Sequence, residues 1–174
     1  MKKGKIIGLI VFLMFMGALG FGILQIVQNP EKYQKKNSNV DVILDATSFY
    51  RDNKTVNESQ LIEMNGQPDS IEEWTYNGLS ATYAIRTLYY GNYSYHFNHD
   101  MLQRISIDNA EIPYENKNDI LTMFGLKKYS NTKINDLNVS YRADKCGVYD
   151  FWIPVMDEDS LDEIRISYTS LFEQ

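Results

Sequence analysis

Residues 55–78 read TVNESQLIEMNGQPDSIEEWTYNG, and this stretch decides how the rest of the chain is interpreted. Thr55 followed by Glu58 three positions later is a capping-box pattern, which favours the start of a helix. Gly66 followed by Pro68 ends that helix, because glycine favours helix ends and proline cannot continue a helix. The stretch therefore predicts a short helix that is followed directly by a strand.

The chain after this helix carries the signals of an antiparallel meander. Asn77-Gly78 is a residue pair that tight hairpins favour, and it separates the strands expected at 72–76 and 79–90. The next strands, each bounded by turn residues, are expected at 93–97, 102–107, 137–143, 148–155 and 161–168. A helix followed by antiparallel strands predicts an α+β fold.

The helix-plus-meander pattern occurs twice, with an offset of 59 residues. The matching residues are Leu61 with Ile120, Met64 with Met123, Gly66 with Gly125, Leu102 with Leu161, Ile105 with Ile164 and Ile107 with Ile166. Because both ends of the pattern keep one offset without a gap, we interpret it as a duplication. The predicted tandem units span 55–110 and 111–174, and Asn116 caps the second helix.

The first 28 residues form a membrane segment in this interpretation. Ile6–Val27 is apolar on all sides and, at helical rise, extends about 33 Å, which is enough to cross a bilayer core. An N-terminal transmembrane helix is therefore expected, with a cleaved signal peptide ending near Ala18-Leu19-Gly20 as the alternative. Residues 29–54 are expected to be a linker, in which Val42–Leu44 is a candidate extra strand.

The charge distribution excludes nucleic acid as a partner. The chain has 174 residues and a net charge of −6, but Lys2, Lys3 and Lys5 all precede the first acidic residue, Glu31. Residues 31–174 therefore carry a net charge of −9, which phosphate backbones repel. The single cysteine, Cys146, excludes an internal disulfide and is expected to be an unpaired thiol, with pairing between two chains as the alternative.

The stretch at 61–77, followed by YSYHFNHDMLQRISI at 93–107, resembles the SmpA/OmlA and β-lactamase-inhibitor-protein-like superfamily. The features that carry the resemblance are Gly66 and Pro68, Trp74 and Tyr76, and Phe97 with Ile105. The resemblance implies tandem helix-plus-sheet units and a non-enzymatic binding module on the outer side of a membrane. The chain departs from the superfamily because it lacks the lipid-modified cysteine and the disulfides found there.

Strand aromatics are the main candidate for partner binding, since the chain has 13 tyrosines, 8 phenylalanines and 2 tryptophans. The candidate partner-binding residues are Trp74, Tyr76, Tyr83, Tyr89, Tyr93, Tyr95, Tyr141 and Trp152. Tyrosine and tryptophan supply large contact areas at low entropic cost, although aromatics on strands also fill cores. Alternation places Tyr93 and Tyr95 on one face of their strand and His96 on the other.

Histidine, cysteine and acidic residues give no strong site for a metal or for catalysis. His96, His99 and Asp100 are the secondary candidates for metal ligands, but we identify no further ligand and expect no metal and no cofactor. Neither histidine lies near a nucleophile motif, so no catalytic residue and no enzymatic activity are expected.

The resulting hypothesis is a single-pass protein of the cell envelope, with its C-terminal part extracytoplasmic and binding another protein or an envelope component. If the N-terminal segment is cleaved, the protein is secreted. Two alternatives remain: an accessory structural subunit of a membrane complex, and an envelope sensor or metal-responsive protein.

Overall fold

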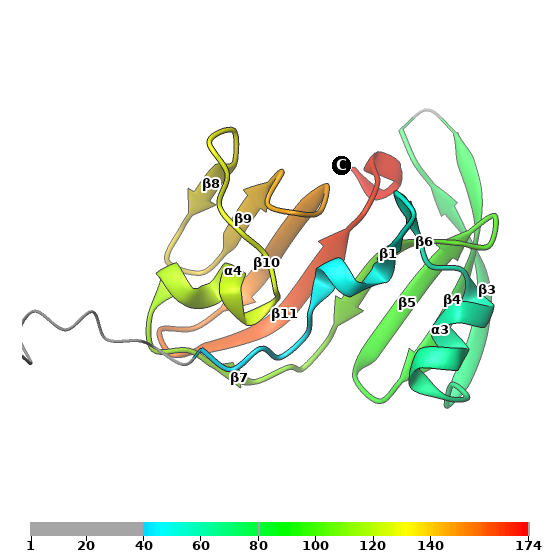
Figure 1. The fold of residues 1–174 in the computed structure, drawn as a ribbon, viewed down its shortest axis with the longest axis horizontal. Helices are drawn as coiled ribbons and strands as arrows, with labels where there is room; N and C mark the ends of the chain where they lie inside the picture. The colour runs from blue at the N-terminus through cyan, green and yellow to red at the C-terminus, as the bar shows by residue number, and fades with distance from the viewer. Residues whose placement is uncertain (1–39, 80, 174) are drawn as a thin grey trace, which may run out of the picture. The chain divides into compact units, whose positions relative to one another are not determined.

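A computed structural model describes residues 40–79 and 81–173, which belong to one compact unit that begins at Val40. The first element is the 3-10 turn η1 (Ala46–Phe49), in which the Asp45 side chain accepts a hydrogen bond from the Thr47 N–H at 3.0 Å. A small hairpin of β1 (Tyr50–Arg51) and β2 (Lys54–Thr55) follows. Ala46 and Phe49 are buried, so this stretch is part of the fold rather than a free linker (Figure 1).

The helix α3 (Glu58–Asn65) is fixed by a capping box that lies two residues after the predicted one. Asn57 is the N-cap: its side chain accepts from the Gln60 N–H, and the Gln60 side chain accepts from the Asn57 N–H, both at 2.9 Å. Leu61 is fully buried beneath the helix. Gly66, with a φ of +83°, ends the helix as the sequence predicts.

A single antiparallel sheet contains nine of the strands in the described part of the chain. Its first half consists of β3 (Ser70–Asn77), β4 (Thr82–Tyr90), β5 (Tyr93–Asn98) and β6 (Met101–Ile107). Its second half consists of β8 (Lys133–Asp136), β9 (Tyr141–Asp144), β10 (Asp150–Met156) and β11 (Ser160–Ser167). The order is β3-β4-β5-β6-β11-β10-β9-β8, and β7 (Ile112–Pro113) pairs with β11.

A second helical stretch precedes the second half of the sheet. It consists of the 3-10 turn η2 (Lys117–Asp119), which Asn116 caps as predicted, and the one-turn helix α4 (Ile120–Met123). Gly125 follows with a φ of +66°, and the chain from residue 43 to 46 runs alongside. The Ala46 N–H, for example, donates to the Phe124 carbonyl at 3.0 Å.

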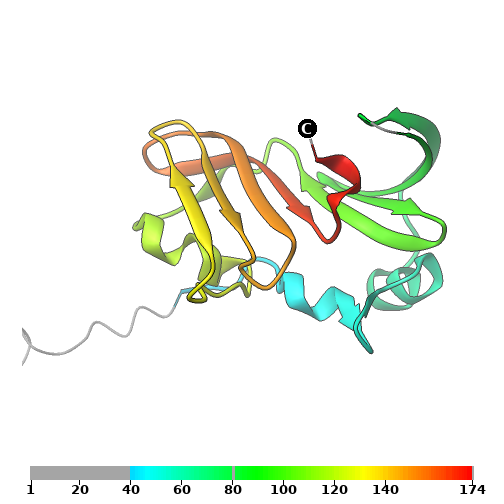
Figure 2. The ribbon, with the colours of Figure 1, turned by 90° about the horizontal axis from the view of Figure 1, so that it is seen from above.

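The helical elements cover one face of the sheet. Leu61 of α3 and Ile120 of α4 join one core cluster with sheet residues such as Leu88, Ile105 and Ile166. Figure 2 shows η1, α3 and α4 on this side and the last turn, η3 (Ser170–Phe172), on the other. The opposite face of the sheet, which no α-helix of the described residues covers, is called the open face below.

The expected α+β fold class is wrong. Strands make up 44 % and helices 17 % of the described residues, so this part of the protein is mostly antiparallel sheet. The helices are short because Gly66 and Gly125 stop them after eight and four residues. The strands of both halves form one continuous sheet, since β6 and β11 pair and join the four strands of the first half to the four of the second.

The junction between β6 and β11 relates the two halves of the sheet. Ser106 lies opposite Arg165, and these two residues are separated by the 59 positions of the sequence offset. Outward from this pair, the strands on one side are β6, β5, β4 and β3, and those on the other are β11, β10, β9 and β8, so both halves run backwards in the sequence toward the edges of the sheet. Equal order does not test common origin, so the duplication and the boundary between 110 and 111 stay predictions.

The predicted transmembrane helix at Ile6–Val27 and residues 29–39 of the predicted linker lie outside the described residues. No helix between residues 40 and 173, Ser80 aside, is both long and apolar enough to cross a membrane.

Candidate functional site

The open face of the sheet carries polar and aromatic side chains in cross-strand rows. One row follows directly opposed residues across seven strands: Tyr89, Ser94, Ser106, Arg165, Trp152, Arg142 and Asn135. The adjacent row contains Glu72, Thr87, His96, Arg104, Ser167, Asp150, Asp144 and Lys133. Because side chains alternate along a strand, all of these residues project away from the helices.

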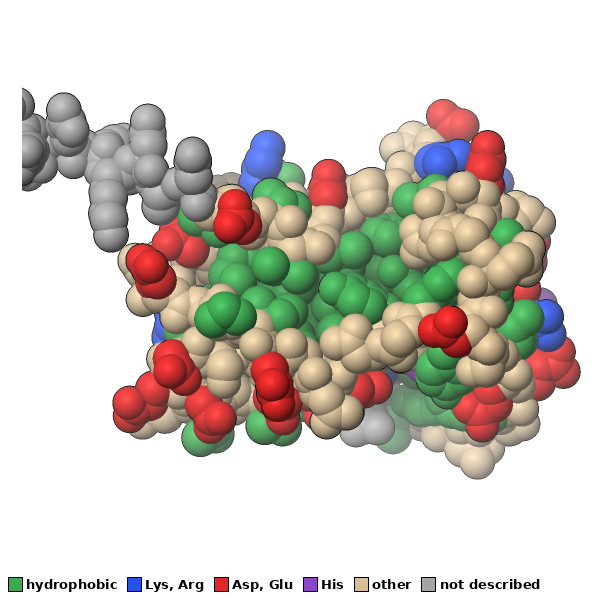
Figure 3. Space-filling model, turned by 90° about the horizontal axis from the view of Figure 1, so that it is seen from below, with side chains coloured by type: hydrophobic (Ala, Val, Ile, Leu, Met, Phe, Trp, Pro, Cys, Tyr) green, Lys and Arg blue, Asp and Glu red, His purple; other side chains and the backbone are tan. Residues whose placement is uncertain are grey.

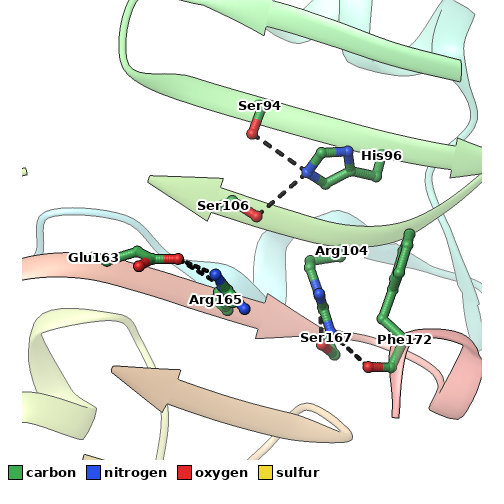
Figure 4. Close-up of polar contacts among 8 residues, drawn as sticks. All are labelled: Ser94, His96, Arg104, Ser106, Glu163, Arg165, Ser167 and Phe172. Carbon is green, nitrogen blue, oxygen red and sulfur yellow. Dashed lines mark hydrogen bonds and ion pairs between the residues drawn. The ribbon is translucent and has the colours of Figure 1, made fainter. Parts of the chain in front are cut away.

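His96 lies at the centre of a hydroxyl network on this face (Figure 4). Its Nδ1 lies 2.9 Å from the Thr87 hydroxyl, which also accepts the Trp74 indole N–H at 2.8 Å. Its Nε2 lies 3.3 Å from the Ser94 hydroxyl and 3.2 Å from that of Ser106. Hydroxyls both donate and accept, so a neutral imidazole is satisfied at both nitrogens in either tautomer.

The environment of His96 keeps the imidazole neutral. Burial, together with the positive charges of Arg104 and Arg165, lowers the pKa of His96 from its usual 6.5 to about 4. A serine next to a histidine resembles a hydrolytic pair, but such a base needs a pKa near neutrality and an orienting carboxylate. His96 has a low pKa and a threonine hydroxyl in the carboxylate's place, which favours a structural or binding role.

Arg104 carries a charge that no carboxylate neutralises at ion-pair distance within the described residues. Its Nε donates to the Ser167 hydroxyl and an Nη donates to the Phe172 carbonyl, both at 3.0 Å. Its guanidinium carbon lies 4.4 Å from the centre of the Phe172 ring. Burial and the nearby Arg165 lower the pKa of Arg104 to about 10, so the side chain remains positively charged at neutral pH.

Trp152 lies between two further guanidinium groups on the open face. Arg142 and Arg165 place their guanidinium carbons 5.5 Å and 5.0 Å from its ring centre, within the range of cation–π attraction. Each arginine also has a carboxylate partner: Arg142 donates to Asp150 at 2.8 Å, and Arg165 bonds Glu163. These contacts hold Trp152 half-buried and fixed in orientation.

An aromatic cluster lies on the other half of the open face. The Trp74 and Tyr76 rings are 6.3 Å apart, and Tyr83 stacks on Tyr76 at the same distance. Phe172 of η3 completes the cluster, at 4.9 Å from Tyr76 and 6.4 Å from Trp74. Phe172 itself is 6 % exposed, whereas the other three rings are half-buried and retain exposed area.

A groove of about 550 Å³ lies at the β8–β9 end of the sheet. Open-face residues Lys133, Asn135, Arg142 and Asp150 line it, together with Tyr149. Its charged lining contains both signs, which suits a polar protein segment better than an apolar small molecule.

The structure divides the eight candidate partner-binding residues between the two faces. Five of them lie half-buried on the open face: Trp74, Tyr76, Tyr83, Tyr89 and Trp152. Tyr95 and Tyr141 are buried in the core, with burial raising the pKa of each to about 12, and Tyr93 packs against the core from its edge. The three core tyrosines therefore do not join the other five.

The candidate metal ligands do not converge. His96 belongs to the open face, whereas His99 and Asp100 form the β5–β6 turn with φ values of +49° and +58°. Asp100 accepts a hydrogen bond from the Glu58 N–H at 3.2 Å, so it supports the start of α3. In the range 40–173, leaving out Ser80, no three His, Cys, Asp or Glu residues are placed to share a metal ion.

Sequence reasoning missed the arginines and Phe172. Arg104 and Ser106 alternate with buried Ile105 and Ile107, and that alternation marks the polar side of β6. Nothing local in the sequence indicates that Arg104 reaches Phe172, because the two lie on segments 68 residues apart.

A surface of different character appears in Figure 3, where hydrophobic side chains form a band across the view and acidic side chains flank it. Several hydrophobic residues pack against the core while remaining partly exposed, among them Leu44, Ile62, Tyr90, Tyr93 and Tyr114.

Comparisons of the chain with protein-family models, with curated proteins and with solved structures find no match. The resemblance to the SmpA/OmlA and β-lactamase-inhibitor-protein-like superfamily therefore stays a prediction.

Proposed function

We propose that the protein is a membrane-anchored, extracytoplasmic protein-binding module without catalytic activity. The apolar segment Ile6–Val27 holds it at the membrane, and the open face of the sheet binds the partner. The observation that carries this proposal is the composition of the open face: five half-buried aromatics and three arginines gather on a rigid sheet surface.

These residue types are the ones that dominate binding energy at protein interfaces. Tryptophan, tyrosine and arginine are enriched among interface hot spots, where they fill desolvated positions near the centre. On this face they are already ordered: Trp152 lies between Arg142 and Arg165, and Tyr89 donates to Glu72 at 2.7 Å. Binding through side chains that are fixed in advance loses little conformational entropy.

The charge pattern supports binding at a defined place rather than over the whole surface. Residues 31–174 carry a net charge of −9, yet Arg104 and Arg165 lie on the two central strands of the open face, and Arg142 of β9 lies beside them on the other side of Trp152. A partner that presents carboxylates is attracted to this cluster and repelled by the acidic surface elsewhere, which fixes its orientation.

Affinity capture with the full chain in detergent tests the proposal. We expect wild-type protein to recover a partner from the membrane extract of its host, and Trp152→Ala or Tyr83→Ala to reduce recovery at least tenfold. Tyr129→Ala is the matched control, because Tyr129 is 51 % exposed but lies in the loop before β8 rather than on the sheet.

Recovery that falls equally in all three variants, or in none of them, contradicts binding through the open face. Thermal unfolding of each purified variant, run in parallel, separates loss of the binding surface from loss of the fold.

A further inference from the structure

The η3 segment, residues 169–173, occupies the middle of the open face with one side chain. Phe172 inserts into a site that we call the aromatic socket, formed by Trp74, Tyr76, His96 and Arg104. The ring centre of Phe172 lies 4.9 Å from that of Tyr76, 5.8 Å from that of His96 and 4.4 Å from the Arg104 guanidinium carbon. A single side chain of the protein's own thereby fills the most aromatic part of the proposed binding surface.

The Phe172 ring is the main buried contact between this segment and the sheet, because residues 169–173 pair with no strand. Three hydrogen bonds add to it: the Thr169 hydroxyl donates to the Gln103 side chain at 2.6 Å, Arg104 donates to the Phe172 carbonyl, and the Tyr149 hydroxyl donates to Glu173. The last of these is solvent-exposed. A segment without ladder hydrogen bonds can open locally without unfolding of the sheet.

When Phe172 fills the socket, the positive charge of Arg104 has no carboxylate partner among the described residues. Arg104 donates to a neutral carbonyl, and no carboxylate of the described residues lies at ion-pair distance from it. The side-chain carboxylate of residues 169–173, that of Glu173, accepts from the Tyr149 hydroxyl at 2.6 Å. Hydrogen bonds from arginine to a carboxylate are stronger than those to a neutral acceptor, so a ligand with a carboxylate next to its ring suits this socket better.

We propose that Phe172 occupies the binding site of the partner, and that the aromatic socket binds a partner segment carrying an aromatic side chain with a carboxylate next to it. This inference deepens the proposed function and rests on it. The partner's ring takes the place of the Phe172 ring, its carboxylate takes the place of the Phe172 carbonyl on Arg104, and η3 leaves the sheet.

Three synthetic peptides test the inference with the full chain in detergent micelles. The probe is YTSLF with a free terminal carboxylate, which places an anionic group directly after the aromatic residue. Its controls are the same peptide ending in an amide and the peptide YTSLA with a free carboxylate. The Trp74 indole N–H signal in NMR reports occupancy of the socket, and the Trp152 indole signal serves as the internal reference.

Phe172→Ala empties the socket, so we expect the YTSLF carboxylate to bind this variant at least tenfold more tightly than it binds wild type. The amide is expected to bind the same variant at least fivefold more weakly than the carboxylate, and YTSLA is expected not to bind. Adding Arg104→Gln to Phe172→Ala removes the difference between carboxylate and amide. Tyr129→Ala is the matched control and binds the peptides as wild type does.

Equal binding to wild type and Phe172→Ala, or no difference between carboxylate and amide, overturns the inference. If Phe172→Ala fails to fold, Phe172→Leu keeps an apolar side chain in place and is expected to gain affinity for the probe to a smaller extent. If neither variant gains affinity, the inference is also overturned. The peptides require no partner, so this failure is distinct from failure of the capture experiment, which depends on Trp152 and Tyr83.

Discussion

At the scale of single residues, the open face is defined by polar groups whose surroundings set their charge. His96 is kept neutral by burial and by two arginines, whereas Arg104 stays charged and faces neutral acceptors. Away from this face, Cys146 is fully buried and its thiol donates a hydrogen bond to the Ala143 carbonyl at 3.5 Å. Each of these states leads to a measurable consequence.

The low pKa of His96 makes the fold less stable in acid. The unfolded imidazole takes up a proton near pH 6.5, whereas the folded one does so only near pH 4. The stability due to neutral His96 is therefore complete above pH 6.5, is lost as the pH falls toward 4, and changes no further below that. The loss is about 3 kcal/mol over this window.

Urea unfolding at pH 7, 5.5 and 4 measures this loss, with His96→Gln as the comparison. The glutamine variant is expected to lose about 3 kcal/mol less than wild type between pH 7 and pH 4. Equal losses in the two proteins would show that His96 is not held neutral by the fold.

Cys146 is expected to be inert in the native protein. Burial raises the pKa of its thiol to about 11, so only about 0.1 % is thiolate at pH 8, and the group is also inaccessible. A chromogenic disulfide reagent should label the native chain at less than one hundredth of the rate seen in denaturant. Fast labelling without denaturant would contradict this and would reopen pairing between two chains.

At the scale of elements, both helices end at glycines, but the two glycines have different surroundings. A Cβ at Gly125 would lie 2.4 Å from the Asp45 Oδ1 and 3.0 Å from the Asp45 Cα, whereas a Cβ at Gly66 would meet nothing within 4 Å. Gly125 therefore ends α4 and also allows the residue 43–46 segment to pass close by. Gly91, in the β4–β5 turn, has a similar φ of +60° and open space around it.

Gly125→Ala and Gly91→Ala form a matched pair that separates backbone strain from close packing. Both place alanine at a positive φ, which costs about 1 kcal/mol, and only Gly125→Ala adds a clash with Asp45, for a total of about 3 kcal/mol. Denaturant unfolding of both variants measures the difference. Equal destabilisation would mean that Asp45 moves aside at no cost.

The turns and face alternation could be predicted from sequence, because they depend on neighbours in the chain. The strand at 93–97 was expected with Tyr95 and His96 on opposite faces, and β5 has this arrangement. The β8–β9 turn was missed: residues 137–140 were expected within a strand, but the Leu137 N–H bonds the Ser140 carbonyl across a turn. That turn contains hydrophobic residues such as Val139, which is exposed, and hydrophobic residues are typical of a strand rather than of a turn.

The candidate site was only partly predictable, because it depends on which face the helices cover. Periodicity identifies two faces of each strand but does not say which one packs on α3 and α4, so Tyr95 and Tyr141 were grouped with Trp74 and Trp152. The open-face cluster also joins residues far apart in sequence, such as Arg104 with Ser167. Contacts of that separation leave no local pattern.

At the scale of the whole described unit, the two halves share one sheet and one core. The core cluster includes Leu88 and Leu102 from the first half and Ile153 and Ile166 from the second. The pairing of β6 with β11 continues the ladder without a break between them. Neither half is expected to remain folded when the other unfolds.

Trp74 in β3 and Trp152 in β10 provide one fluorescent reporter in each half. Trp74→Phe and Trp152→Phe each leave a single tryptophan among the described residues, and denaturation followed by fluorescence then reports on one half at a time. After correction for each variant's stability by circular dichroism, the fluorescence transition should coincide with the dichroism transition in both. Transitions that separate by more than experimental error would indicate two independently folding units.

The central position of β11 also determines when the sheet can be completed during synthesis. β6 emerges well before β11. The edge of β6 that pairs with β11 stays unpaired until then, because the opposed residues of β11 lie 57 to 63 positions later in the chain. Pairing over such separations is slow, and an unpaired strand edge can join another chain in the meantime. The nascent chain therefore exposes this edge until residue 167 has been synthesised, and a folding chaperone that binds during this interval would prevent pairing with another chain.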